Sequence, residues 1–75
     1  MSRSFFSEQI EILAERLEGT VEVAIIHNQP GGRVKFAATY WPAKFYQPSR
    51  PLTVLPGEPV VVVGRQGITL LVMPV

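Results

Sequence analysis

Two runs of branched apolar residues near the C-terminal end constrain the fold more than any other feature of this sequence. They are residues 60–63 and 68–73, and Gly64, Arg65, Gln66 and Gly67 separate them. Valine and isoleucine favour strands, and a short connection that contains glycine is typical of a hairpin. Both runs are far shorter than the roughly 20 apolar residues that a membrane-spanning helix needs. The sequence therefore predicts a β-hairpin at residues 60–73 and no membrane span.

Three further segments alternate apolar and polar residues with the period of two that is typical of half-buried strands. They are residues 20–27, 33–36 and 40–46. Pro42 cannot donate a hydrogen bond to a neighbouring strand, which predicts an edge or a bulge at this position. Residues 47–59 contain four prolines and are expected to form an ordered crossing without a regular element. Five short strands at this spacing predict an all-β protein, a small closed barrel.

The N-terminal segment has a different period and predicts one short α-helix over residues 7–18. Ser7 is a favourable N-cap, and Gly19 stands where a helix often ends in a left-handed residue. The expected organisation is an amphipathic helix within residues 1–18 followed by a barrel over residues 19–75, in a single domain. The apolar residues that recur at steps of three and four are Ile10, Leu13, Ala14 and Leu17.

Composition leaves little catalytic chemistry in this chain. It has no aspartate and no cysteine, its six acidic residues are all glutamates, and His27 is its single histidine. A general base needs a positioned partner, and a zinc site needs several ligands at a workable spacing. We therefore expect no catalytic residue, no metal ligand and no cofactor-binding residue, and we interpret His27 as a turn residue. The expected function is non-enzymatic, without a small-molecule substrate.

Charge is unevenly distributed, although the net charge is only +1. Most acidic residues precede residue 23, and most basic residues follow it. Alternation places cations and tyrosines together on the outer face of residues 33–36 and 40–46, as on barrels that bind single-stranded nucleic acid. The alternative is that these residues only keep the face soluble. The candidate nucleic-acid-binding residues are Arg33, Lys35, Tyr40, Lys44 and Tyr46.

The N-terminal segment also has more apolar residues than one narrow helical stripe requires. Phe5 and Phe6 precede the expected helix, and Ile12 lies off its main stripe. Surplus apolar surface can bind a partner protein or a second copy of the chain. The alternative is that the helix plugs one end of the barrel, where a small domain gains from the additional burial. Phe5, Phe6 and Ile12 are the candidate partner-binding residues.

Several blocks in order resemble the C-terminal domain of NfeD-like proteins. The blocks are residues 32–36, the pair Trp41 and Ala43, residues 55–63 and residues 67–74. They match a Gly-x-Val strand, an aromatic-x-Ala strand, a Val-rich strand and a Gly-x-x-Leu-x-Val-x-Pro ending. The resemblance covers about residues 19–74. It implies a five-stranded OB-fold barrel that acts as a binding and assembly module.

The same resemblance implies partners of the stomatin, prohibitin or flotillin type, which organise membrane microdomains. We expect a short family form, without transmembrane or protease domains. Its expected function is protein interaction or self-association, and single-stranded nucleic-acid binding is the alternative. The expected location is the cytoplasm, with a partner protein holding the chain at the membrane.

Overall fold

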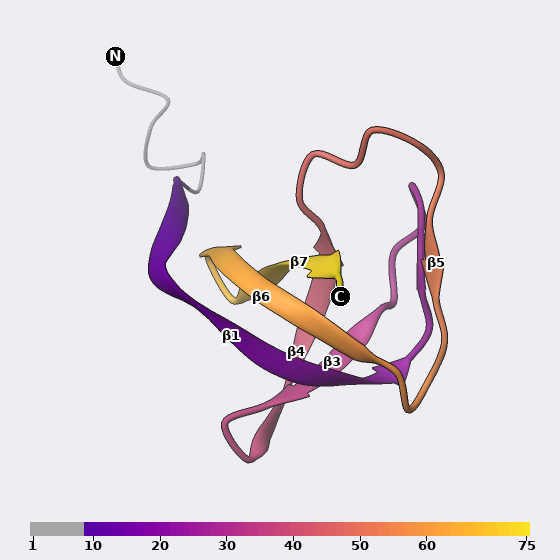
Figure 1. Ribbon diagram of the computed structural model, residues 1–75, viewed down its shortest axis with the longest axis horizontal. Helices are drawn as coiled ribbons and strands as arrows, with labels where there is room; N and C mark the ends of the chain where they lie inside the picture. Colours follow the sequence, from indigo (N-terminus) through magenta and orange to yellow (C-terminus); the bar gives the residue numbers. More distant parts are fainter. Residues whose placement is uncertain (1–8) are drawn as a thin grey trace.

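A computed structural model describes residues 9–75 of the chain, and all the regular elements among them are β-strands. Five strands form a closed barrel in the order β1-β3-β4-β7-β6. The remaining two, β2 and β5, pair with each other beside one end of the barrel (Figure 1). The strands are β1 (Ile10–Val23), β2 (Ile25–Ile26), β3 (Arg33–Phe36), β4 (Thr39–Phe45), β5 (Thr53–Val54), β6 (Pro59–Gln66) and β7 (Thr69–Pro74).

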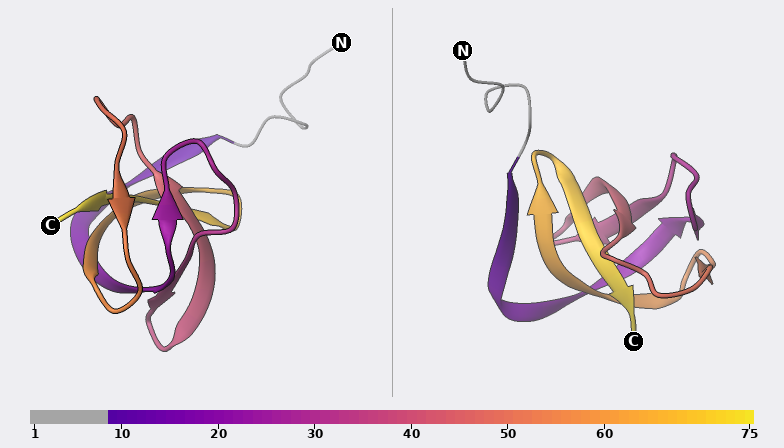
Figure 2. Two further views of the ribbon diagram at one scale, coloured as in Figure 1. Left: turned by 90° about the vertical axis from the view of Figure 1, so that its right-hand side faces the viewer. Right: turned by 90° about the horizontal axis from the view of Figure 1, so that it is seen from above.

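The long, curved strand β1 closes the barrel, because it pairs with two neighbours. It lies antiparallel to β6 along most of its length and antiparallel to β3 near its C-terminal end. Figure 2 shows how β1 bends around the other strands to reach both. β4 and β7 are the parallel pair, and β6 and β7 form the C-terminal hairpin. This arrangement confirms the expected all-β, five-stranded barrel of the OB-fold type.

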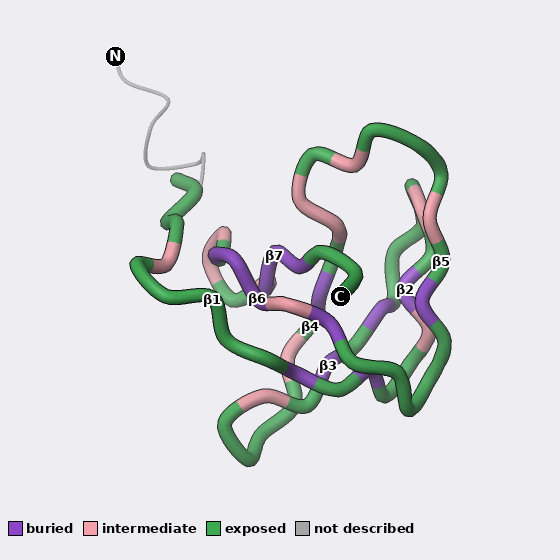
Figure 3. Tube along the Cα trace, viewed as in Figure 1, coloured by how far each residue is buried: buried purple, intermediate pink, exposed green. Residues whose placement is uncertain are grey.

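The core is built mostly from valines. The side chains that point into the barrel come from all five of its strands and from β2 and β5. Leu13, Phe36, Trp41 and Phe45 pack against this cluster while remaining partly exposed. In Figure 3 the more buried positions alternate with exposed ones along β3, as expected for a strand with one solvent-exposed face. The buried cluster consists of Val21, Ile25, Val34, Ala43, Val54, Val60, Val62, Leu70 and Val72.

The helix expected over residues 7–18 is wrong for all of its residues from Ile10 onward, which lie in β1. Ser7 and Glu8 lie outside the described residues. An isolated helix of about 12 residues is marginal in water, whereas β1 gains a ladder of backbone hydrogen bonds from β6. Gly19 does not cap a helix either. A Cβ at Gly19 would lie 2.7 Å from Val34 Cγ1, so the glycine permits close packing between β1 and β3.

The structure also differs from the prediction at one divided strand and at one additional strand. The strand expected over residues 20–27 is divided into β1 and β2, because a register shift between Val21 and Val23 breaks the alternation. Val23 is consequently exposed, while Ile25 is buried and leads into the β2–β5 pair. The crossing at residues 47–59 contains one short strand, β5, where no regular element was expected.

The C-terminal hairpin is confirmed, but its turn is shifted. The turn lies at Gly67 and Ile68, and Gly64 to Gln66 belong to β6. Gly67 has a φ of 62°, a left-handed conformation that favours glycine at the start of a tight turn. Gly64 is not a turn residue. Its lack of a side chain allows the backbone of β1 to pass close to β6.

Two grooves as candidate functional sites

The first groove lies between the N-terminal half of β1 and the outer part of β4, and it encloses about 370 Å³. Its floor is formed by Leu13, Phe36 and Trp41, which are all partly buried. The indole Nε1 of Trp41 donates a hydrogen bond to the backbone oxygen of Phe36 at 3.3 Å. This bond orients the ring, so the floor is an aromatic surface of fixed orientation. We call this site the apolar groove.

The apolar groove forms where the pairing between β1 and β6 is interrupted. Ile12 pairs with Gly64 and Leu17 pairs with Val62, so four residues of β1 lie between these pairs opposite one residue of β6. The additional residues of β1 cannot all pair with β6, and the strand bows outward there. Leu13 and Ala14 in the bowed segment line the groove. A bulge of this kind redirects side chains, as is common beside binding sites.

Exposed apolar side chains and one ion pair border the apolar groove. Ile12 lines it and is 55% exposed, and Ile10 and Leu17 are also exposed along β1. Arg65 Nε lies 2.8 Å from Glu11 Oε1, and both side chains line the groove. An exposed pair of this type contributes only about 0–1 kcal/mol to stability. The border therefore combines apolar contact area with two charges of opposite sign.

The sequence-based prediction for this site falls partly outside the described residues. The structure places Ile12 on the exposed border of the apolar groove, whereas Phe5 and Phe6 are not among residues 9–75. The floor residues Phe36 and Trp41 were not predicted as site residues. Their aromatic character was the available signal, but it indicates core packing equally well.

The outer face of β3 and β4 brings together four of the five predicted nucleic-acid-binding residues. Lys35 is paired directly opposite Tyr40, and Arg33 opposite Pro42. Lys44 lies two residues beyond Pro42 on the same face of β4. The four residues on this face are all exposed: Arg33, Lys35, Tyr40 and Lys44. Tyr46 follows the end of β4 and is only half-exposed. The predicted face is therefore present as a geometric feature, although its function remains a proposal.

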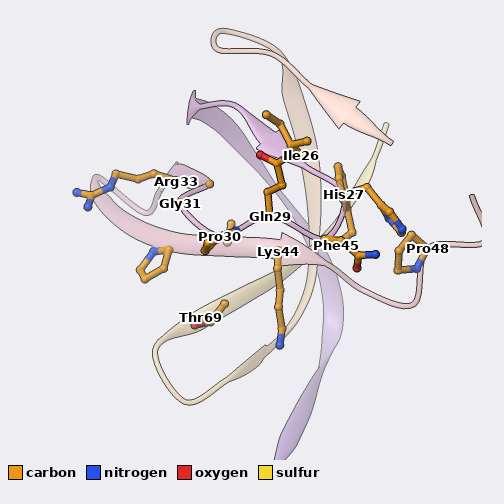
Figure 4. A pocket seen from close by; sticks show the side chains of 14 residues that line it. Ile26, His27, Gln29, Pro30, Gly31, Arg33, Lys44, Phe45, Pro48 and Thr69 are labelled. Carbon is orange, nitrogen blue, oxygen red and sulfur yellow. The ribbon is translucent and has the colours of Figure 1, made fainter. Parts of the chain in front are cut away.

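A second groove of about 500 Å³ lies at one end of this face. It is enclosed by the loop of residues 27–32, by β3 and β4, and by Pro48 and Thr69 (Figure 4). Its charged residues are Arg33 and Lys44, and no carboxylate lines it. We call it the basic groove. Arg33 and Lys44 were predicted as candidate binding residues, but the groove was not, because its walls come from segments far apart in the chain.

His27 lines the basic groove without a partner for catalysis. Its Nδ1 is shielded from solvent and has no hydrogen-bond partner in the described part of the chain. Residues 9–75 also contain no group of three or more histidine, cysteine, aspartate or glutamate side chains that could hold a metal ion.

Fold and grooves together define a small OB-fold barrel with surfaces for binding. The family model of the NfeD-like C-terminal, partner-binding domain matches residues 14–74. The chain therefore belongs to the NfeD-like family, as the sequence resemblance indicated. The function of a partner-binding domain is protein interaction.

A solved crystal structure supports this assignment. It is the soluble domain of a membrane protein implicated in regulation of membrane protease activity from Corynebacterium glutamicum. The similarity has a TM-score of 0.63 at 26% sequence identity, and it covers 76% of this chain and 84% of that one. No curated protein matches the sequence. Among residues 9–75 there is no helix with the length and hydrophobicity that a bilayer crossing requires.

Proposed function

We propose that this chain is a non-enzymatic interaction module that docks a partner protein in the apolar groove. The partner is a membrane-scaffold protein of the stomatin, prohibitin or flotillin type, or a second copy of the chain. The observation that carries the proposal is the row of exposed apolar side chains on β1, Ile10, Ile12 and Leu17, beside an oriented tryptophan. Binding to such a partner holds the chain at the membrane from the cytoplasmic side.

The physical basis is the cost of leaving this surface in water. Burial of apolar area contributes about 25 cal/mol per Å², and the exposed isoleucines of β1 gain this energy only when a partner covers them. Trp41 is the type of residue that often dominates binding energy, particularly in a pocket surrounded by other contacts. The Glu11 and Arg65 charges at the border give the partner a preferred orientation.

Replacement of Ile12 by glutamate should weaken partner binding by about tenfold or more, because a charge would enter a surface that must be dehydrated. Ile68→Glu is the matched control, since Ile68 is 68% exposed at the β6–β7 turn and does not line the apolar groove. Binding is measured with the immobilised stomatin-, prohibitin- and flotillin-type proteins of the same organism. Sedimentation velocity of the chain alone measures self-association.

The two variants separate the proposed site from general hydrophobicity. We expect Ile12→Glu to lose binding or self-association while Ile68→Glu retains it, with circular dichroism showing that both variants are folded. Equal losses in the two variants would contradict a specific role for the apolar groove. Retention of full binding by Ile12→Glu would also contradict it.

A second candidate function is single-stranded nucleic-acid binding on the outer face of β3 and β4. The observation in its favour is the exposed cross-strand pair of Lys35 and Tyr40, a cation beside a ring on which a base can stack. With Arg33 and Lys44, this face has three cations. Each neutralised phosphate of a single strand contributes about −0.7 to the slope of log K against log salt.

If this face binds nucleic acid, a twelve-residue oligothymidylate should bind with a salt slope of about −2. Tyr40→Ala should then weaken binding by about tenfold, since one stacked base contributes about 1–3 kcal/mol. Fluorescence anisotropy at several salt concentrations measures both quantities. Ile68→Ala, at the exposed β6–β7 turn, is a comparison outside this face. Absence of binding at low salt would eliminate the second candidate.

A further inference from the structure

We propose that the basic groove receives an extended acidic segment of a partner protein, with carboxylates held by Arg33 and Lys44. This surface is separate from the apolar groove, and the two proposals can fail independently.

Two cations lie close together here without a carboxylate. Arg33 is opposite Pro42, and Lys44 is two residues further along β4 on the same face. Diagonal neighbours of this kind in an antiparallel pair are about 7–8 Å apart. No ion pair joins either side chain to an acidic group of residues 9–75, and the lining contains no acid. Neither charge is neutralised within the lining of the groove, so a bound anion would stabilise both.

None of the five glutamates among residues 9–75 lines the basic groove. Four of the five lie on β1, and the fifth, Glu58, accepts a hydrogen bond from the backbone N–H of Leu55 at 2.9 Å. Glu22 is the nearest of these to Arg33, because its neighbour Val23 pairs with Arg33, but no ion pair joins the two side chains and the lining of the groove itself has two cations and no carboxylate. Such a separation of charge steers an acidic segment toward the basic groove and raises its rate of association.

The spacing of the cations fits a peptide in extended conformation. Alternate residues of a strand lie on one face about 7 Å apart, which matches the diagonal between Arg33 and Lys44. Pro42, Phe45 and Pro48 supply apolar walls for the intervening side chains. In Figure 4, Arg33 lies toward one end of the groove, His27 and Pro48 lie toward the other, and Lys44 lies between them. The groove can thus hold two carboxylates and the chain that links them.

The walls are fixed before a ligand arrives. The N–H of Gln29 donates to the oxygen of Ile26 within the loop at 3.0 Å, and the N–H of Ala43 donates to the oxygen of Gly32 at 3.0 Å. The first bond closes a turn, and the second ties the end of the loop to β4. A preformed groove loses little conformational entropy when it binds a peptide.

A peptide fits this groove better than a nucleic-acid strand. Binding sites for single-stranded nucleic acid combine a line of cations with several exposed aromatic rings. The basic groove is lined by two rings, Phe45 and His27, which are both only half-exposed, and Tyr40 is not among its lining residues. Proline rings form much of the remaining surface, and they pack well against aliphatic side chains.

The test uses a fluorescent twelve-residue peptide in which glutamate alternates with alanine. Comparison probes are the matching glutamine–alanine peptide and a twelve-residue oligothymidylate. We expect the glutamate peptide to bind and to shift the amide resonances of Gly31, Gly32 and Lys44 in ¹H–¹⁵N spectra of the full chain. Arg33→Gln and Lys44→Gln should each weaken binding by about tenfold, since each removes one charge-assisted contact.

Two control variants make the result specific. Arg16→Gln removes one exposed cation from β1 and should leave the affinity within about twofold, since Arg16 does not line the groove. Ile12→Glu should also leave it nearly unchanged, which distinguishes this site from the apolar groove. Equal affinity for the glutamine peptide would overturn the proposal, as would tighter binding of the oligothymidylate or an equal loss in Arg16→Gln. Concentration-dependent shifts of the same amides without peptide would also overturn it, because they would assign the groove to a second copy.

Discussion

Replacement of Ile25 by alanine is expected to lower the free energy of unfolding by about 2–5 kcal/mol, because it leaves a cavity in the core. Ile25 is 2% exposed and belongs to the cluster inside the barrel. For a domain of 75 residues the total stability is about 4–11 kcal/mol, so this single change removes a large share of it. Urea denaturation monitored by the fluorescence of Trp41, the single tryptophan, measures the effect.

The neighbouring residue provides a matched control. Ile26 follows directly in the same strand, is the same residue type and is 38% exposed. Ile26→Ala should cost about 1 kcal/mol or less, because it removes little buried area and leaves no closed cavity. Equal losses for the two variants would show that the β2 register is not the one described.

Replacement of Gly64 by alanine is expected to cost about 3 kcal/mol, at the upper end of overpacking effects. A Cβ at Gly64 would lie 2.5 Å from the backbone oxygen of Glu11 and 3.3 Å from the Cα of Ile12. These are backbone atoms, so the strand itself must move. We expect β1 to separate from β6 near this point. Because Gly64, Glu11 and Ile12 all line the apolar groove, partner binding should fall with the stability.

Gly57→Ala distinguishes steric clash from backbone strain. Gly57 has a φ of 90° but nothing within 4 Å of an added Cβ, so only the conformational penalty of about 1 kcal/mol applies. Hydrogen exchange should increase at Ile10 and Ile12 in Gly64→Ala, and not in Gly57→Ala. Unchanged protection of β1 in Gly64→Ala would contradict the close approach of the two strands.

Local sequence signals were sufficient for strands whose pattern agrees with their tertiary environment. Residues 33–36 alternate strictly and form β3 within the same bounds. The C-terminal hairpin was also predictable, because its valine-rich runs favour strands wherever they pack. Its turn was misplaced, since Gly64 and Gly67 both satisfy the sequence rule and only the approach of β1 distinguishes them.

The N-terminal prediction failed because two periodicities coexist there. Ile10, Leu13 and Leu17 fit a helical face, whereas Ile10, Ile12 and Ala14 fit a strand. The edge of β6 decides between them, because its backbone groups need a partner and residues 10–20 provide it. This partner lies about 50 residues away in the sequence, beyond the reach of any local pattern.

Some residues of the two grooves were predictable from the sequence, but the shape of the grooves was not. Arg33 and Lys44 were identified as outward cations because charge follows from alternation, whereas Ile12 was identified from the stripe of a helix that the structure replaces with β1. The apolar groove depends on a bulge in β1, and the basic groove on a loop that folds against β4. Neither feature has a signature in the residues that produce it.

Alternation and residue type alone determined that this chain makes a small β-barrel, because apolar side chains at every second position must share one buried face. Only the tertiary structure decided which residues form β1, where the barrel closes and where its surface is hollowed. These features depend on pairing between segments far apart in the chain, and the free energy of that pairing exceeds the local preference of residues 10–18 for a helix.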